Sequence, residues 1–420
     1  MKSKLYVMNI VAIIALILSI FSGVTMIGCS GGDGGGGNAT EWDIPVMTIT
    51  SGYLAGPFSE GWWALQEMRD YVNSHGGIAG KPIKLTLYPC GSDVASAVSA
   101  AGAIIDKRPL IALLWVGPDQ LAAIEPAFYG ANITSFVAST TKPVYTSYNK
   151  TMVALKTGDY GFIVGGPALW VNDNNVTNNV TIQNVAVVYD TAGQSTWATL
   201  ANQAAASLNS TGVNATVMSF SSTGVVDWTS IVTPWLSAGY DGYVPIATYL
   251  GAKGMFNKMY ELGFNDSRRF MFTFTSSQNE FWLVATNNAT GAYFEIPFNP
   301  TYNGTLWQST WAASKAARGV EPYINLEWSS NAIFMLKAAI ESSGITGNTA
   351  NVTTERPQLL NAWRNLTEVD GIAGPINMYQ GFCAMNNFLL EAAGNETLVT
   401  SRLVGTSNYS ALQCYTYYHS

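Results

Sequence analysis

The most restrictive feature of this sequence is a repeated alternation of short apolar strands with amphipathic helical segments. Strands separated by helices of this length predict parallel sheets that are covered on both faces. The first series is predicted to contain strands at 46–51, 83–88, 111–115 and 134–137, with intervening helices at 59–74, 94–106 and 120–129. It therefore forms a run of βαβ units.

A second series follows after a break, so the sequence predicts an α/β fold with two doubly wound parallel-sheet lobes. Its strands are predicted at 185–189, 213–220, 242–246 and 269–274, with helices at 195–208, 228–237 and 252–262. The remaining strand, 292–296, and the helices at 305–317 and 328–343 are too few for a third domain, so we expect them to complete the first lobe. The chain then crosses between lobes more than once, and the crossovers form a multi-strand hinge.

These elements predict where the chain divides. Lobe 1 is expected to comprise residues 44–158 and 291–380, and lobe 2 residues 159–290 and 381–420. The segment 29–43 is rich in glycine, so we expect it to be a flexible linker with few side chains to pack.

Residues 1–28 form either a signal peptide or a retained membrane anchor. Two lysines precede an almost wholly apolar run at 5–27, which is long enough to span a bilayer uncut. The run ends at Gly28-Cys29, which resembles the lipobox of lipoprotein signal peptides. Cleavage there would make Cys29 the lipidated N-terminus. In both alternatives the folded body is tethered to the membrane on its outer side.

The surface chemistry argues against nucleic acid as a partner. The net charge is −7, and charged residues make up only 11% of the chain, so no basic surface neutralises phosphates. Fourteen Asn-X-Ser/Thr sequons suggest that N-glycans replace charges as the solubilising groups. They begin at Asn38, Asn132, Asn149, Asn175, Asn179, Asn209, Asn214, Asn265, Asn288, Asn303, Asn351, Asn365, Asn395 and Asn408. Our hypothesis is an archaeal cell-surface protein from an acidic habitat.

No motif for catalysis, for a metal or for a cofactor is found. The two histidines, His75 and His419, lie in a helix stop and next to the C-terminus, and no P-loop, nucleophile elbow or zinc-ligand spacing is present. We therefore expect neither enzymatic activity nor a bound cofactor or metal. Cys383 and Cys414 bracket the C-terminal segment and are candidates for a disulfide, which leaves Cys90 unpaired.

Several motifs together resemble the leucine/isoleucine/valine-binding family of type I periplasmic binding proteins. The most recognisable is Asn73-Ser-His-Gly-Gly-Ile-Ala-Gly80, and the others are residues 44–62, 139–143, 227–228 and 371–377. The resemblance covers roughly residues 44–400. Residues 88–93 depart from the family pattern, and the tail from Gly394 matches nothing in it.

This resemblance implies the extracytoplasmic receptor of an ABC importer. Such a receptor captures a small amino-acid-like, carboxylate or amide ligand as two lobes close about a hinge, and hands it to a membrane permease. The alternative is a cell-surface sensor or structural glycoprotein that keeps the same two-lobed fold, because fold alone does not determine function.

Ligands of open α/β sheets bind beyond the carboxyl ends of the strands. In the first lobe, the resemblance implies that Ser139, Thr140 and Thr141 hold a ligand carboxylate; the alternative is that they cap a turn. In the second lobe, Gln194 and Tyr249 are expected to contact the ligand.

The sequence leaves open which acidic residue, if any, pairs with a positive group of the ligand. Thr275 stands near the place where amino-acid-binding members of the family often have an acid. Asp119 or Glu60 would supply a carboxylate from the first lobe, unless these acids are merely solvated. Of Trp62 and Trp63, one is expected to cover the ligand and the other to lie in the core.

Overall fold

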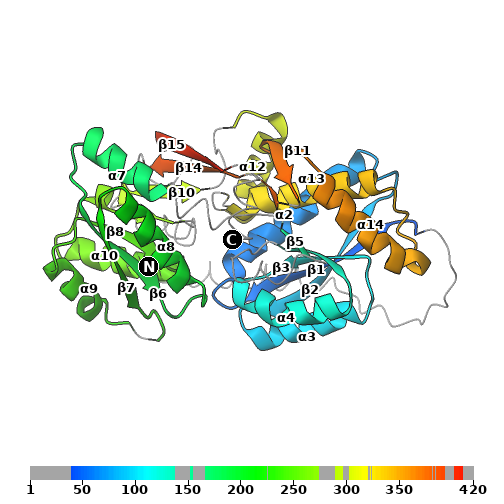
Figure 1. Ribbon diagram of the computed structural model, residues 1–420, viewed down its shortest axis with the longest axis horizontal. Coiled ribbons are helices and arrows are strands. Elements are labelled where there is room, and N and C mark those ends of the chain that lie inside the picture. Colours follow the sequence, from blue (N-terminus) through cyan, green and yellow to red (C-terminus); the bar gives the residue numbers. More distant parts are fainter. Residues whose placement is uncertain are drawn as a thin grey trace, which may run out of the picture. The chain divides into compact units, whose positions relative to one another are not determined.

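The computed structural model confirms the α/β class with parallel sheets (Figure 1). It describes residues 39–137, 152–154, 166–224, 226–273, 289–296, 302–319, 322, 324–380, 382–383, 385–392 and 402–409. The predictions for residues 1–28, for Cys29 and for most of the glycine-rich linker fall outside these ranges. None of the helices within them is both long and apolar enough to cross a membrane.

The first sheet is wholly parallel, in the order β2-β1-β3-β4-β5. Its strands are β1 (Trp42–Ser51), β2 (Ile83–Gly91), β3 (Ile111–Trp115), β4 (Thr134–Val137) and β5 (Met152–Ala154). The helices that connect them are α2 (Ala55–Ser74), α3 (Val94–Ile105) and α4 (Pro118–Gly130). Every strand and helix predicted for the first series is present, within a few residues of its expected bounds.

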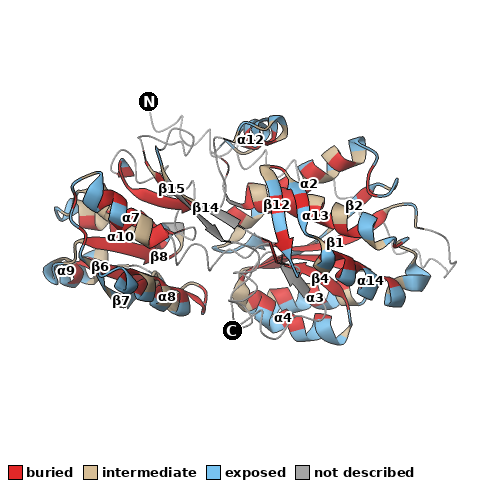
Figure 2. Cartoon of the chain, turned by 45° about the horizontal axis from the view of Figure 1, so that its top comes forward, coloured by how far each residue is buried: buried red, intermediate tan, exposed pale blue. Residues whose placement is uncertain are grey.

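Strand β1 is apolar on both faces because helices cover the sheet on both sides. Ile44 and Val46 belong to a cluster that includes the buried face of α2, whereas Met47 and Ile49 belong to a cluster with α3 and α4. Figure 2 shows the consequence, since the strands are buried while the flanking helices carry exposed outer faces.

The second parallel sheet has the order β7-β6-β8. It comprises β6 (Asn184–Asp190), β7 (Asn214–Phe220) and β8 (Gly242–Ile246), connected by α8 (Trp197–Ser210) and α9 (Trp228–Ser237) and followed by α10 (Tyr249–Glu261). A parallel bridge between Tyr243 and Phe270 leads from β8 to the neighbouring strand β9 (Met271–Phe272). Val185 and Val187 face one cluster and Ala186 and Val188 another, so this sheet is also covered on both faces.

The strand predicted at 292–296 pairs with strands outside the first sheet. This strand, β10 (Tyr293–Ile296), pairs in parallel with β9 and antiparallel with β14 (Met385–Glu391), in the sheet β15-β14-β10-β9. The sequence of a short apolar strand does not indicate which strand lies beside it. The lobe boundaries stay a prediction.

The last strand, β15 (Arg402–Tyr409), is bound into the same sheet. The guanidinium of Arg402 lies 2.5 Å from Asp173 Oδ2, on helix α7 (Gly166–Val176), and also pairs with Glu391. Tyr293 donates a hydrogen bond to Asp173 at 2.6 Å. Burial raises the pKa of Asp173, but the hydrogen bonds from Arg402 and Tyr293 outweigh it, and the net pKa is lowered.

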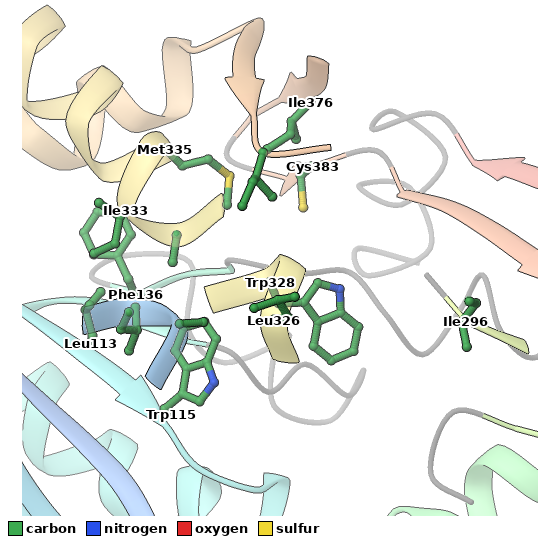
Figure 3. Packing of buried hydrophobic residues seen from close by; sticks show 14 of the residues in the cluster. Leu113, Trp115, Phe136, Ile296, Leu326, Trp328, Ile333, Met335, Ile376 and Cys383 are labelled. Carbon is green, nitrogen blue, oxygen red and sulfur yellow. The ribbon is translucent and has the colours of Figure 1, made fainter. Parts of the chain in front are cut away.

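Three further helices extend the fold: α12 (Thr305–Arg318), α13 (Ile324–Ser343) and α14 (Val352–Asn365). Helix α13 packs along α2, and Figure 3 shows Leu326 and Trp328 near Trp115 of β3. The sequence did not predict α7, α14 or the antiparallel strands β11 (Glu368–Gly371), β12 (Gly374–Tyr379) and β13 (Phe382–Cys383). The Asn-rich α7 lacks a regular apolar stripe, which explains why no helix was predicted there.

The motif at 73–80 closes α2 and aligns β2. The Asn73 side chain accepts a hydrogen bond from Ile83 N at 2.7 Å and donates one to Ile83 O at 2.9 Å, which imitates a neighbouring strand. Gly76, Gly77 and Gly80 have positive φ angles of 96°, 72° and 77°. Glycine adopts such angles without a steric cost, so the motif is explained by backbone geometry.

Replacing Arg356 with methionine is expected to destabilise the protein by about 3 kcal/mol, because hydrogen bonds from a charged donor contribute roughly 1.5–3 kcal/mol each. Arg356 is buried on α14 and donates to the carbonyls of Pro109 and Ala131, at 2.6 and 3.2 Å. Chemical denaturation measures the change. The control is Arg69→Met, which breaks only the surface pair with Asp70 and costs less than about 1 kcal/mol. Equal losses of stability in the two variants would contradict the role of Arg356 in holding α14 to Pro109 and Ala131.

Candidate functional site

The loops that follow β1, β3 and β6 meet through side chains. Gln194 donates from Nε2 to the Tyr53 hydroxyl at 2.6 Å and accepts at Oε1 from the backbone N–H of Asp119 at 3.1 Å. Asp119 in turn accepts from Ser195 N at 3.1 Å and from the Ser195 hydroxyl. We call Tyr53, Asp119, Gln194 and Ser195 the closure cluster.

The closure cluster joins the two parallel sheets at the carboxyl ends of their strands. Tyr53 lies in the loop after β1 and Asp119 in the first turn of α4, which follows β3 of the first sheet, whereas Gln194 and Ser195 follow β6 of the second. Gln194 is buried, while Tyr53 is 40% exposed. Burial raises the pKa of Tyr53, and the charges of Asp119 and Asp190 raise it further, so the hydroxyl stays protonated at neutral pH.

The loop that carries Gln194 is held by a buried carboxylate. Asp190, at the end of β6, accepts hydrogen bonds from Ala192 N at 2.9 Å and from the backbone N–H of Ser222 at 3.0 Å. Gly193 is also required here, because a Cβ on it would fall 1.9 Å from the ring of Trp197. The loop after β6 and the loop after β7 are therefore fixed to each other.

Two of the predicted ligand contacts, Asp119 and Gln194, are thus brought together, but they bind one another. The predicted Trp62 is half-buried and packs against the core, as does Trp63. Glu60, the alternative source of charge, is fully buried and pairs with Arg318, whose Nη1 lies 2.5 Å from Glu60 Oε1. Its charge is therefore compensated within the protein.

The side chains of the remaining predicted ligand contacts lie outside the described part of the structure. Tyr249 begins α10, directly after Thr248, whose hydroxyl caps that helix by accepting from Gly251 N at 3.2 Å. The Tyr249 side chain lies outside the described part of the structure, as do Ser139, Thr140, Thr141 and Thr275. Cys414 lies outside it as well, so the disulfide with the buried Cys383 stays a prediction.

Sequence reasoning missed Tyr53, Ser195 and the neighbouring Gln120. Tyr53 directly follows β1, so its place at a carboxyl strand end was a usable signal. Gln120 is buried and donates to Ser92 O at 2.5 Å, while its Oε1 has no hydrogen-bond partner in the structure. An acceptor of this kind suits a ligand N–H or O–H group.

Cys90 and the acidic residues do not form a reactive centre. Burial raises the pKa of the Cys90 thiol to about 11, with a smaller contribution from the charge of Asp93, so the thiol is neutral. Among the described residues, no group of three or more His, Cys, Asp or Glu side chains is placed to hold a metal ion.

Comparison with known proteins gives a consistent picture of the fold. A family model described as "periplasmic binding protein" matches residues 41–388. No curated protein matches the chain.

Two similar solved structures are branched-chain amino acid binding proteins. The leucine-binding protein LivK of Thermotoga maritima is 18% identical with a TM-score of 0.71, and the match covers 87% of this chain and 98% of that chain. LivJ of Streptococcus pneumoniae, in complex with isoleucine, is 16% identical with a TM-score of 0.70. The match covers 88% of this chain and 99% of LivJ.

A third similar structure has a different ligand. It is an ABC-transporter solute-binding protein of Rhodopseudomonas palustris in complex with benzoate. This protein is 13% identical with a TM-score of 0.69, and the match covers 88% of this chain and 98% of that chain. At these identities the likeness shows the shared two-lobed fold.

Proposed function

Because this chain belongs to the periplasmic binding protein family, we propose that it is the extracytoplasmic solute receptor of an ABC importer. It captures a small ligand between two lobes by hinge closure and delivers it to a membrane permease. The body is tethered through its N-terminal segment, either by a lipid on Cys29 or by the retained apolar run 5–27.

The closure cluster is the observation that carries this proposal. Its four side chains come from strand ends of two separate sheets, where α/β folds bind ligands. Direct contacts of this kind exist only when the lobes are closed, so they contribute to the closed state alone. A ligand that touches both lobes shifts the same equilibrium further.

The ligand class is a small organic acid or amino acid. Two of the similar structures are complexes with isoleucine and with benzoate, and both ligands have a carboxylate. For this chain we propose Ser139, Thr140 and Thr141 as carboxylate donors, with Tyr249 and Thr275 on the opposite lobe. Gln120 adds a buried acceptor. Because Glu60 is neutralised by Arg318 and Asp119 is engaged by Ser195, neither is left over for a ligand ammonium group.

The test is a thermal-shift series with amino acids, amides, aromatic acids and short aliphatic acids. A ligand that binds only the folded protein stabilises it by RT ln(1 + [L]/Kd), which is about 2.7 kcal/mol at a hundredfold excess over Kd. We expect at least one carboxylate to raise the Tm. The control is a variant with Ser139, Thr140 and Thr141 replaced by alanine, in which that rise is lost. If no solute shifts the Tm, the receptor proposal fails.

The second candidate function is a non-transport sensor or structural glycoprotein on the same fold. The hydrogen bonds from Ser195 to Asp119 favour this second function if they hold the lobes closed permanently. Small-angle scattering separates the two functions. A receptor changes its radius of gyration when the stabilising solute is added, whereas a permanently closed protein does not.

Replacing Asp119 with alanine is expected to weaken closure. The variant loses both hydrogen bonds from Ser195, which together favour the closed state by about 1 kcal/mol, or about fivefold in population. The ligand-free radius of gyration should therefore increase. Asp93→Ala is the matched control, because Asp93 accepts the same pair of bonds from Ser96, at 2.8 and 2.9 Å, within the N-terminal cap of α3 and away from the contact between the lobes. Identical scattering from both variants would contradict the closure role of Asp119.

A further inference from the structure

The sequon asparagines share one structural property. Nine of the fourteen lie where the structure describes the side chain, and all nine are exposed: Asn132, Asn175, Asn179, Asn209, Asn214, Asn265, Asn303, Asn351 and Asn365. The asparagines buried in the described part of the chain are Asn174, Asn325 and Asn331, and none of these begins a sequon. Sequons are thus found where a large polar group can be attached.

The buried asparagines show why they are unsuited to modification. Asn174 donates to the carbonyl of Arg268 at 3.0 Å, and Asn325 donates to the carbonyl of Pro57 at 2.9 Å. Asn331 accepts from Ile372 N at 2.9 Å and donates to Glu327. These amides hold separate elements together, and a sugar on any of them would force those elements apart.

The exposed sequons are also distributed unevenly over the fold. Six of the nine lie in loops that lead from a helix into a strand with a parallel partner, or at the ends of those loops. Asn132 precedes β4, Asn175 and Asn179 precede β6, Asn209 and Asn214 flank the loop into β7, and Asn265 precedes β9. These positions are at the amino ends of the parallel strands.

The opposite edges of the sheets β2-β1-β3-β4-β5 and β7-β6-β8 carry no sequon in the described residues. The loops after β1, β2, β3, β6, β7 and β8 contain none, and the closure cluster is built from residues that follow β1, β3 and β6. Asn303 is an exception in the other sheet, because it follows β10. The closure cluster is therefore separated from the sequons at the amino ends by the length of the sheet.

We propose that the chain carries N-linked oligosaccharides at the amino-end edges of its sheets, which leaves the closure edge uncovered. This deepens the proposed extracytoplasmic function and rests on it, since the transfer takes place outside the cytoplasm. The donor is a lipid-pyrophosphate-linked oligosaccharide. The asparagine Nδ2 forms a bond to the anomeric carbon and loses a proton, the bond from that carbon to the pyrophosphate oxygen breaks, and the lipid pyrophosphate leaves.

Asn132 and Asn179 are the first acceptors. Both stand in turns with positive φ, at 53° and 52°, and among the described residues neither side-chain amide has a hydrogen-bond partner. The amides of Asn175 and Asn209 instead close their loops by donating to the carbonyls of Ile182 and Ala215. The low charge of the chain, 11% of residues, makes neutral sugars a main source of surface hydration.

The first test is peptide mapping by mass spectrometry of the full-length protein purified from its native cells. We expect the peptides that contain Asn132 and Asn179 to carry hexose-containing additions. The proposal is overturned if both peptides occur only at their unmodified masses.

A matched pair of variants tests the Asn179 sequon in the same cells. Thr181 is exposed, and Thr181→Val removes the sequon while keeping a β-branched side chain. Thr181→Ser keeps the sequon. We expect the intact mass to fall by one oligosaccharide in Thr181→Val alone, and equal masses apart from the substitution would overturn the assignment. An unglycosylated protein that still gains stability from a solute would refute this inference and leave the receptor proposal intact.

Discussion

Replacing Glu295 with glutamine is expected to raise the free energy of unfolding at neutral pH and to leave it unchanged below about pH 4. Glu295 is fully buried on β10, and neither carboxylate oxygen has a hydrogen-bond partner among the described residues. Burial alone raises the pKa of this group well above its ordinary value. The buried carboxyl is therefore neutral in the folded protein and ionised in the unfolded chain at neutral pH.

The sign of the pH dependence follows from proton binding. Because the folded state holds a proton that the unfolded state releases, unfolding becomes easier as pH rises from about 4.3, the ordinary pKa of glutamate, towards the folded pKa. The slope is about 1.4 kcal/mol per pH unit. Denaturant titrations between pH 4 and pH 8 should show this loss in the natural protein and a flatter profile in Glu295→Gln.

A second acid contributes in the same direction. Burial raises the pKa of Glu327 to about 8, and a hydrogen bond from Asn331 offsets part of this rise. Each of these two groups therefore lowers the free energy of unfolding as the pH rises from mild acid towards pH 8. The space for Glu295 is made by Gly166, whose Cβ would lie 2.7 Å from the Glu295 carboxyl carbon.

Glu355 provides the matched control for the Glu295 variant. It is also buried, but it accepts hydrogen bonds from Thr346 N, the Thr346 hydroxyl and Gly347 N, at 2.8, 2.7 and 2.8 Å. Glu355→Gln replaces one charged acceptor oxygen with a donor, so it should destabilise the protein at neutral pH. Equal effects of the two substitutions would contradict the difference in environment.

Replacing Gly77 with alanine is expected to destabilise the protein by more than about 3 kcal/mol. The φ of Gly77 is 72°, and a Cβ on it would fall 2.1 Å from the carbonyl oxygen of Lys81. The positive φ alone costs an alanine about 1–2 kcal/mol, and the clash with a backbone atom forces the turn to open. Opening it also separates Asn73 from Ile83.

Variants at Gly76 and Gly80 distinguish the cost of a positive φ from the cost of the steric clash. Both have positive φ, but a Cβ on either meets nothing within 4 Å. Gly76→Ala and Gly80→Ala should therefore lose only the conformational part, about 1–2 kcal/mol. Chemical denaturation of the three variants measures the difference, and equal losses at all three positions would show that the Lys81 carbonyl imposes no steric limit.

Much of the fold follows from local patterns in the sequence. Strands β3 and β8 and helix α9 have the predicted bounds, because short apolar runs and capped amphipathic segments mark them. Asp227 caps α9 with its side chain, for example. Pattern reasoning failed at α7 and at the antiparallel strands near the C-terminus, where apolar and polar residues follow neither period.

The candidate site was only partly predictable. Its location at the carboxyl ends of strands follows from the α/β order, and this rule identified Asp119 and Gln194. That the Gln194 side chain accepts a hydrogen bond from the backbone N–H of Asp119 depends on how two lobes meet, which no local pattern encodes. Likewise, the pairing of Glu60 with Arg318 joins residues that are far apart in the chain.

The sheet β15-β14-β10-β9 has a consequence for how the protein is made. The first sheet draws on residues 42–154, an unbroken stretch that is complete early in synthesis. This sheet cannot be completed until β15, at residues 402–409, has been made, and only then does Arg402 reach Asp173. Because chains emerge N-terminus first, it is completed long after the first sheet. Deleting residues 402–409 would therefore damage the sheet that is completed last and leave the first-made sheet intact.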